Sequence, residues 1–310
     1  DVTMMGRHET GRSGRAAIAL GAGTVAVILS VLCSGASAAT TAYWDADQTI
    51  SSAVTVAEDR LYVRSAATIT VTDGGTLTLP VVSGQETNIG ITTNGNLLIE
   101  GTGQVLGGAS SVNIGRYTSG SMTMTGGSFG MTTGTLDLAR GAGGAGALDI
   151  SGGTLSLRGL RACYQGNGTS TALLRVTGSA ATITMYSLDL SYVAAGTTTL
   201  AFVLDDTTKH ISTISTATAN LGSAVIDMGT ASGFAPTSGQ VFDLVTITGS
   251  GAFNDISALS LAAGDIGNWT LQTSADKKTL QAVAVPEPAT MALLGLGILG
   301  VVARKRRSGR

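Results

Sequence analysis

Few residues of this chain combine types and spacing that could support catalysis. Asp137 and Asp189 each lie in an apolar–polar–apolar triplet, and Arg161 lies in a similar triplet between them. If these triplets stack as successive strands about 4.8 Å apart, the two carboxylates are about 9.6 Å apart. That separation is near the upper end of the range for an inverting glycosidase. Arg161 stands between the two carboxylates, however, and its positive charge would keep both ionised, so neither could act as the general acid. We therefore interpret the three residues as a column of alternating charges that holds neighbouring strands together.

Cysteine and histidine are too scarce for a thiolate metal cluster or a catalytic thiol. Cys163 is the only cysteine outside the N-terminal apolar run, and His8 and His210 are the only histidines. Asp205 and Asp206 are interpreted as a solvated turn, because no glycine–aspartate calcium-binding repeat accompanies them. We therefore expect no catalytic residue, no metal site and no cofactor.

The elements that must position these residues form a repeat of about 26 residues. Gly75, Gly101, Gly127 and Gly153 are spaced at this interval. An apolar–polar–apolar triplet precedes each glycine or the next equivalent position, at residues 69–71, 97–99, 122–124, 148–150 and 174–176. Alternation with a period of two indicates a strand with one buried face. A fixed period of this length indicates stacked units, each too thin to bury its own apolar face.

Each repeat contains two further strand-like runs, which makes three strands per coil. One run follows the glycine turn, and the other recurs at residues 89–91, 112–114, 136–138, 160–162 and 188–190. This pattern predicts an all-β chain with a parallel β-solenoid over residues 66–192. An antiparallel sandwich is the alternative, but a sandwich has no reason to keep a constant register. Residues 39–65 are expected to form an N-terminal β cap, and residues 193–284 a small C-terminal β-module.

The stacking predicts two sets of charged neighbours. The third run places Gly90, Asn113, Asp137, Arg161 and Asp189 in one outward, solvent-exposed column. On the first run, Asp149 and Arg175 should meet in the same way. Exposed pairs of this kind set strand register more than they add to stability.

The amino-acid composition indicates a folded body without a nucleic-acid partner. The chain has 310 residues with a formal charge of −2, and only 12% of its residues are charged. So small a net charge argues against a nucleic-acid partner. Apolar residues make up 43% and alternate with polar ones, so the body is expected to fold and not to be disordered.

The N-terminal segment, residues 1–38, has the pattern of a secretory signal peptide. Basic residues precede an apolar run at residues 16–32, which is expected to be helical, and Ala36 and Ala38 place small residues at the cleavage positions. Signal peptidase is then a processing partner. Cys33 raises a lipoprotein alternative, but Leu32 stands where a small residue is expected.

The C-terminal segment, residues 285–310, has three parts. Pro286, Glu287 and Pro288 precede an apolar run at residues 289–303, which is expected to form a second terminal helix. A basic group then follows, made of Arg304, Lys305, Arg306 and Arg307. The apolar run is shorter than the 20 or so residues that comfortably span a bilayer, and its basic flank should stay cytoplasmic. A permanent single-span anchor is the alternative to a temporary stop.

This ending resembles the PEP-CTERM sorting signal, which consists of a Pro-Glu-Pro motif, an apolar helix and an arginine-rich tail. The resemblance implies export, processing by an exosortase-type enzyme, and an association with Gram-negative bacteria that produce exopolysaccharide. It implies transient membrane attachment followed by release to the outer envelope or extracellular matrix. It implies no activity for the body, whose Gly-Gly-Thr-Leu repeats resemble autotransporter-like surface proteins.

From these signals we expect an exported, non-enzymatic structural or adhesive protein, with exopolysaccharide as a possible partner. One alternative is a carbohydrate-active β-helix enzyme, either a lyase or a hydrolase. Another is a carbohydrate-binding module that uses Tyr43, Trp44 or Tyr164.

Overall fold

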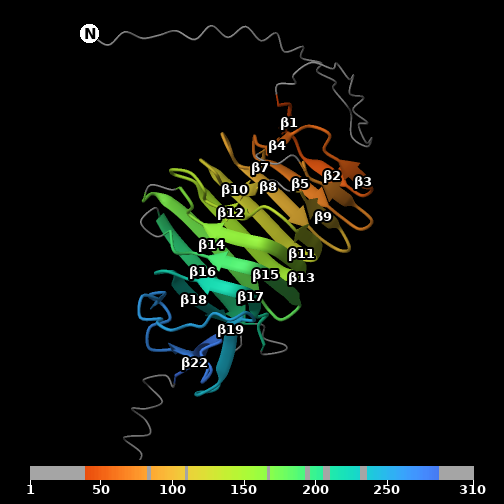
Figure 1. The fold of residues 1–310 in the computed structure, drawn as a ribbon. Helices are drawn as coiled ribbons and strands as arrows, with labels where there is room; N and C mark the ends of the chain where they lie inside the picture. The colour runs from red at the N-terminus through yellow and green to blue at the C-terminus, as the bar shows by residue number, and fades with distance from the viewer. Residues whose placement is uncertain are drawn as a thin grey trace, which may run out of the picture. The chain divides into compact units, whose positions relative to one another are not determined.

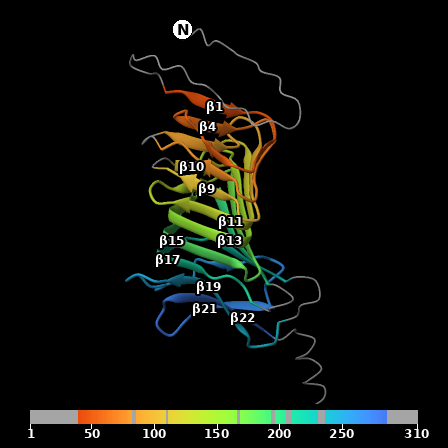
Figure 2. The same ribbon diagram turned by 90° about the vertical axis from the view of Figure 1, so that its right-hand side faces the viewer.

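A computed structural model describes residues 39–81, 85–108, 111–165, 168–192, 196–204, 210–230 and 236–285. These residues contain 22 β-strands and no helix. The strands follow the chain in a parallel β-solenoid of about 26 residues per coil, with coils stacked one on the next (Figures 1 and 2). The predicted all-β solenoid is therefore confirmed. Both apolar runs predicted as terminal helices lie outside the described residues.

Strands from successive coils stack into three parallel β-sheets, which we call walls A, B and C. Three sheets are what the three strand-like runs per repeat predict. Wall A begins with β1 (Thr41–Trp44), β4 (Arg60–Val63), β7 (Glu86–Ile89), β10 (Ser111–Ile114) and β12 (Leu136–Leu138). It continues through the C-terminal parts of β13 (Ala145–Ala162), β15 (Ala181–Asp189) and β17 (Ile214–Asn220).

Walls B and C complete each coil. Wall B contains β2 (Gln48–Ile50), β5 (Ala67–Val71), β8 (Gly95–Ile99), the first parts of β11 (Ser119–Met131) and β13, β14 (Ser170–Thr177), β16 (Gly196–Leu204), β18 (Val225–Thr230) and β20 (Ser260–Leu261). Wall C contains β3 (Ala53–Thr55), β6 (Thr76–Thr78), β9 (Gln104–Gly107), later parts of β11 and β13, first parts of β15 and β17, and β19 (Val241–Ile247).

The core consists of columns of like apolar side chains, one from each coil. On wall B, Leu97 pairs with Met122, Met122 with Leu148, and Leu148 with Leu174. All four are at most 4% exposed. Full burial of such a side chain stabilises the fold by about 1.5–3 kcal/mol. The first-run triplets thus stack in the predicted register.

The corner between walls A and B depends on glycine. Gly120 follows this corner, and a Cβ built there would lie 2.1 Å from the backbone oxygen of Ile89 in the coil below. Gly115, at the end of β10, has a φ of +70°, which strongly favours glycine. At Gly115 and Gly120, therefore, the neighbouring coil approaches too closely for a Cβ atom.

Two boundaries differ from the sequence-based predictions. Residues 39–65, expected as a cap, contain the first coil and the first strand of the second, because β1, β2 and β3 pair in parallel with β4, β5 and β6. Parallel pairing also continues past residue 193, through β16, β17, β18 and β20. The antiparallel part is limited to β19, β22 (Thr279–Ala284) and β21 (Trp269–Thr273).

The predicted register of the third run was wrong in its first coil. Asn88, and not Gly90, pairs with Asn113, so residues 87–89 replace residues 89–91 in the column. Gly90 lies at the corner, with a φ of +76°. A shift of two residues keeps Ile89 on the inward face but places the polar Thr87 at an apolar position, so alternation of apolar residues favoured the wrong register.

We expect Gly120→Ala to destabilise the protein by about 1–3 kcal/mol, because the new methyl group forces apart two backbones. Gly130→Ala in the same strand is the matched control, since a Cβ there meets no atom within 4 Å. Thermal unfolding of both variants measures the difference. Equal melting temperatures would contradict close packing at the corner.

Thr87 provides a second test, because it occupies an apolar position of wall A between Leu61 and Val112. It is 1% exposed, and its hydroxyl has no hydrogen-bond partner among the residues that the structure describes. Thr87→Val should therefore stabilise the protein by about 1 kcal/mol or more.

The control for Thr87 is Thr135→Val, which removes a hydroxyl that accepts from Arg161 Nη2 at 2.9 Å. We expect this variant to be destabilised in chemical denaturation. A loss of stability in Thr87→Val would show that its hydroxyl has a partner.

Candidate functional site

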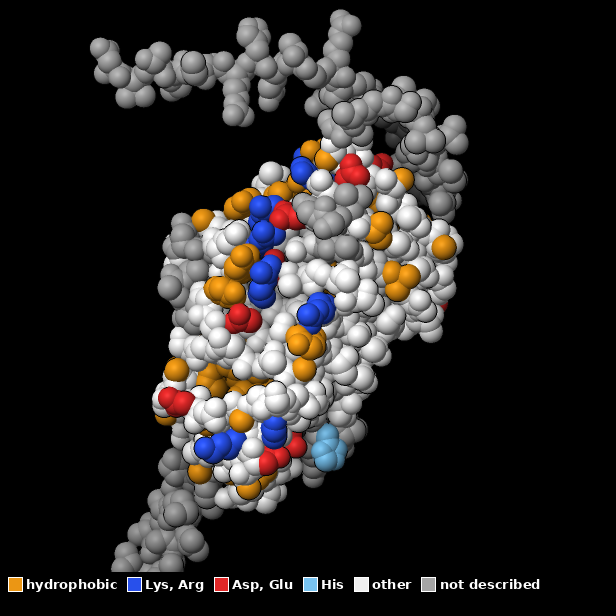
Figure 3. All heavy atoms as spheres, in the orientation of Figure 1, with side chains coloured by type: hydrophobic (Ala, Val, Ile, Leu, Met, Phe, Trp, Pro, Cys, Tyr) orange, Lys and Arg blue, Asp and Glu red, His pale blue; other side chains and the backbone are white. Residues whose placement is uncertain are grey.

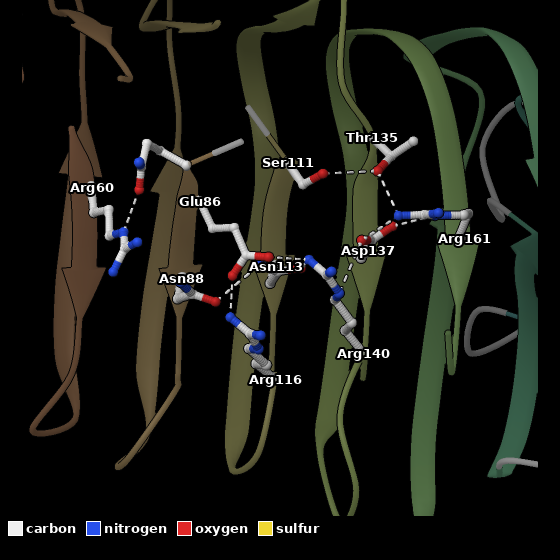
Figure 4. A network of polar contacts seen from close by, with 11 residues as sticks. Arg60, Glu86, Asn88, Ser111, Asn113, Arg116, Thr135, Asp137, Arg140 and Arg161 are labelled. Carbon is white, nitrogen blue, oxygen red and sulfur yellow. Dashed lines mark hydrogen bonds and ion pairs between the residues drawn. The ribbon is translucent and has the colours of Figure 1, made fainter. Parts of the chain in front are cut away.

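The outward side of wall A carries the largest group of interacting polar side chains that we find among the described residues. We call this group the polar face. Figure 4 shows its members, which are Arg60, Glu86, Asn88, Ser111, Asn113, Arg116, Thr135, Asp137, Arg140 and Arg161. They come from β4, β7, β10, β12 and β13, from the corners that follow β10 and β12, and, for Thr135, from the position just before β12.

Strand register places the centre of the polar face in one column. Asn88 pairs with Asn113, Asn113 with Asp137, and Asp137 with Arg161. Asn113 Nδ2 donates to Asn88 Oδ1 at 2.9 Å, although both residues are fully buried. The column therefore joins neighbouring coils through side chains as well as through the backbone.

Asp137 and Arg161 form the tightest ion pair of this column. Arg161 Nε and Nη2 donate to the two carboxylate oxygens of Asp137, each at 2.7 Å. Burial alone would lower the pKa of the Arg161 guanidinium, but the hydrogen bonds and charge of Asp137 outweigh burial and raise it. The predicted contact between these residues is confirmed.

The prediction that this pair is exposed was wrong. The Asp137 side chain is 0% exposed and that of Arg161 is 23% exposed. Arg161 covers Asp137 from one side, while Arg140 approaches from its own corner, with Nε 3.9 Å from Asp137 Oδ2. The strand pattern shows which way Asp137 points, but long side chains from neighbouring corners decide its exposure.

Asp189 lies opposite Arg161 on the next coil but makes different contacts. Its Oδ1 accepts from the backbone nitrogen and the hydroxyl of Ser191, at 3.1 and 2.6 Å. Arg161 thus forms its ion pair with Asp137 and not with Asp189. Both carboxylate oxygens of Asp137 accept hydrogen bonds from Arg161. In this arrangement neither oxygen of Asp137 is free to protonate a leaving group, as a glycosidase acid must.

A second cluster on the polar face lies at Glu86, which sequence analysis did not single out. One carboxylate oxygen accepts from Arg116 and the other from Arg140. Arg140 Nη1 also donates to Asn113 Oδ1 at 3.3 Å. The two arginines are 24 residues apart and each follows its strand by two positions, so the coil period alone could have revealed their stacking.

Aromatic rings border the arginines. The Arg161 guanidinium carbon lies 3.8 Å from the centroid of the Tyr164 ring. Tyr164 and Tyr192 pack edge to face, with their ring centroids 5.0 Å apart. Tyr117 is 50% exposed and lies beside Arg116. Of the predicted sugar-contacting residues, Tyr164 is therefore in the polar face. Tyr43 is exposed on the first coil beside Arg64, and Trp44 packs against the core.

The second predicted ion pair is on wall B. Asp149 pairs with Arg175 in the register, and Arg175 Nη1 donates to Asp149 Oδ1 at 3.1 Å. Both side chains are largely accessible, at 30% and 44% exposed. This pair matches its prediction in position and in exposure.

Wall B also carries a shallow groove of about 490 Å³ on its outer side. Small side chains line the groove, among them Ser119, Ser121, Ala145 and Ala147. Asn96 and Ser121 are hydrogen-bonded to one another at 2.7 Å. None of the lining residues is charged, so the groove offers hydrogen bonds but no acid or base.

Cys163 is buried, and burial raises the pKa of its thiol, which disfavours the reactive thiolate. No group of three or more histidine, cysteine, aspartate or glutamate side chains in the described ranges is arranged to hold a metal ion.

The predicted processing residues lie outside the described residues. They are Ala36 and Ala38, then Pro286, Glu287 and Pro288, and finally Arg304, Lys305, Arg306 and Arg307. Among the residues that the structure describes, no helix is long and apolar enough to cross a membrane.

The two Asp–Arg pairs differ chiefly in burial, which gives a direct test. Asp137→Ala should cost about 3–5 kcal/mol, because it leaves Arg161 partly buried without its partner. Asp149→Ala should cost about 1 kcal/mol or less, because its pair is exposed and screened. Urea unfolding of the two variants compares them. Similar losses would show that Asp137 is not held in a buried pair.

Comparison with known proteins locates one recognisable segment. No curated protein and no solved structure matches the chain. Residues 284–307 match the PEP-CTERM protein-sorting motif, which confirms the resemblance seen in Pro286, Glu287 and Pro288. The motif implies export, direction to the envelope and processing by an exosortase-type enzyme. The chain thus carries a PEP-CTERM sorting signal, and the matched segment begins at Ala284, the last residue of β22.

Proposed function

We propose that this chain is an exported, non-enzymatic structural or adhesive protein of the bacterial envelope or exopolysaccharide matrix. The observation that carries the proposal is the sorting motif at residues 284–307. Signal peptidase would remove residues 1–38, and an exosortase-type enzyme would act at the C-terminal signal. The apolar run at residues 289–303 would hold the protein at the membrane until that step.

The solenoid body supports a structural role. Its strongest charged contact, between Asp137 and Arg161, joins two coils and leaves no free carboxylate oxygen at Asp137. Asp149 and Arg175 likewise join neighbouring coils. Side chains that could have served as catalytic groups therefore act as stacking contacts. A long, repetitive surface suits adhesion because the same contact can recur along it.

Sorting can be tested in the exporting bacterium with a motif variant. In the native protein, mass spectrometry should find no peptide from residues 289–310 in the released material. Pro286→Ala/Pro288→Ala should retain these peptides and stay in the membrane fraction. Pro236→Ala, outside the motif, is the matched control and should behave as the native chain. Released protein that still contains residues 289–310 would contradict sorting by cleavage.

The non-enzymatic assignment has its own test. The purified protein is incubated with a panel of acidic and neutral polysaccharides, and the products are assayed for new reducing or unsaturated ends. We expect none above the level of a heat-denatured sample. Time-dependent chain cleavage would instead favour a carbohydrate-active lyase or hydrolase.

A further inference from the structure

We propose that the polar face binds an acidic polysaccharide, with sugar carboxylates held by Arg116 and Arg140 and sugar rings against Tyr117. This inference rests on the proposed function, because export places the protein among extracellular glycans. It adds a ligand class and a binding surface.

The distribution of charge is the first argument. Residues 39–285 contain 10 basic and 17 acidic residues, so this part of the chain is acidic overall. Four of its seven arginines nevertheless lie on the polar face, namely Arg60, Arg116, Arg140 and Arg161. These four arginines outnumber the carboxylates in this region, which are Glu86, Asp137 and the neighbouring Asp189. Figure 3 shows basic side chains in a row over the upper coils, beside side chains of the hydrophobic class, which includes tyrosine.

Unused hydrogen-bond donors are the second argument. A guanidinium has five N–H donors, yet Arg116 uses only Nη1 toward another described residue, Glu86. Arg140 Nε and Asn88 Nδ2 also lack a hydrogen-bond acceptor among the described residues, but both atoms are buried and lie out of reach of a surface ligand. Arg60 donates to a neutral group, Gln85, and not to a carboxylate. The donors of Arg116 that face no described acceptor are therefore the ones that a carboxylate-bearing ligand would use.

The repeat geometry is the third argument. Arg116 and Arg140 both stand two residues after the paired residues Ile114 and Leu138, so they occupy the same corner of successive coils. Such positions recur about every 4.8 Å along the solenoid. A linear glycan laid along the coils could present its acidic groups to both arginines. Arg116 and Arg140 are both positively charged, and Glu86 is the carboxylate that they share. An added carboxylate would therefore also reduce the repulsion between the two arginines.

The tyrosines favour a glycan over a polyphosphate. Tyr117 is 50% exposed beside Arg116, and Tyr164 lies next to Arg161 at the equivalent corner two coils from Arg116. Exposed aromatic rings can pack against the apolar face of a sugar, which a bare phosphate chain lacks.

The test measures binding of the full-length chain, purified in mild detergent, to polygalacturonate by isothermal titration calorimetry at low ionic strength. Arg116→Gln should weaken binding by about tenfold, the loss expected for a charge-assisted contact. Arg175→Gln removes one arginine from wall B and should change affinity less than twofold. Binding should also weaken as salt is added.

A second variant protects the test against misfolding of Arg116→Gln. Tyr117→Ala alters an exposed ring, so its melting temperature should match the native protein while its affinity falls several-fold. Four outcomes would overturn the proposal: no binding of polygalacturonate, equal losses in Arg116→Gln and Arg175→Gln, equally tight binding of neutral dextran, or equally tight binding of polyphosphate. Each is separable from failure of the proposed function, because export and C-terminal processing are measured in cells.

Discussion

Parallel hydrogen bonding between successive coils is the constraint on which the rest of this structure depends. Once Leu97 is paired with Met122 and Met122 with Leu148, the neighbouring residues of these wall B strands are placed above their counterparts. The same register that builds an apolar column inside the solenoid builds a polar column outside it. Because the coil spacing is about 4.8 Å, side chains in one column must be mutually compatible. Asp137 beneath Arg161, and Asp149 beneath Arg175, meet that condition.

The corners limit what can be placed between the walls. At Gly120 the backbone of the adjacent coil comes close enough to exclude a methyl group, and at Gly115 the chain takes a left-handed conformation. Ala139 and Cys163 also have positive φ at equivalent corners, so the conformation is imposed there despite a side chain. Corner geometry thus fixes where the next residue points, which explains why Arg116 and Arg140 stack.

The sequence was sufficient for properties that depend on period alone. It predicted three strands per coil, the register of the wall B triplets, and both Asp–Arg contacts. It was insufficient where a polar residue occupies an inward position, as Thr87 does, and where long side chains decide burial. Asp137 is outward in its strand, yet Arg140 and Arg161 enclose it. The cluster around Glu86 also combines a strand residue with two corner residues, a combination that strand alternation does not reveal.

The contrast between walls A and B shows how one fold can separate stability from recognition. On wall B the outward side is nearly uncharged, and its one Asp–Arg pair is exposed and self-contained. On wall A the buried pair at Asp137 anchors a surface in which Glu86 fixes the orientation of Arg116 and Arg140, and Arg116 keeps donors that no other described residue uses. Arginines held in this way lose less conformational freedom when they bind than free surface arginines would. A rigid, repeating scaffold therefore lowers the entropic cost of ordering the arginines when they bind a ligand.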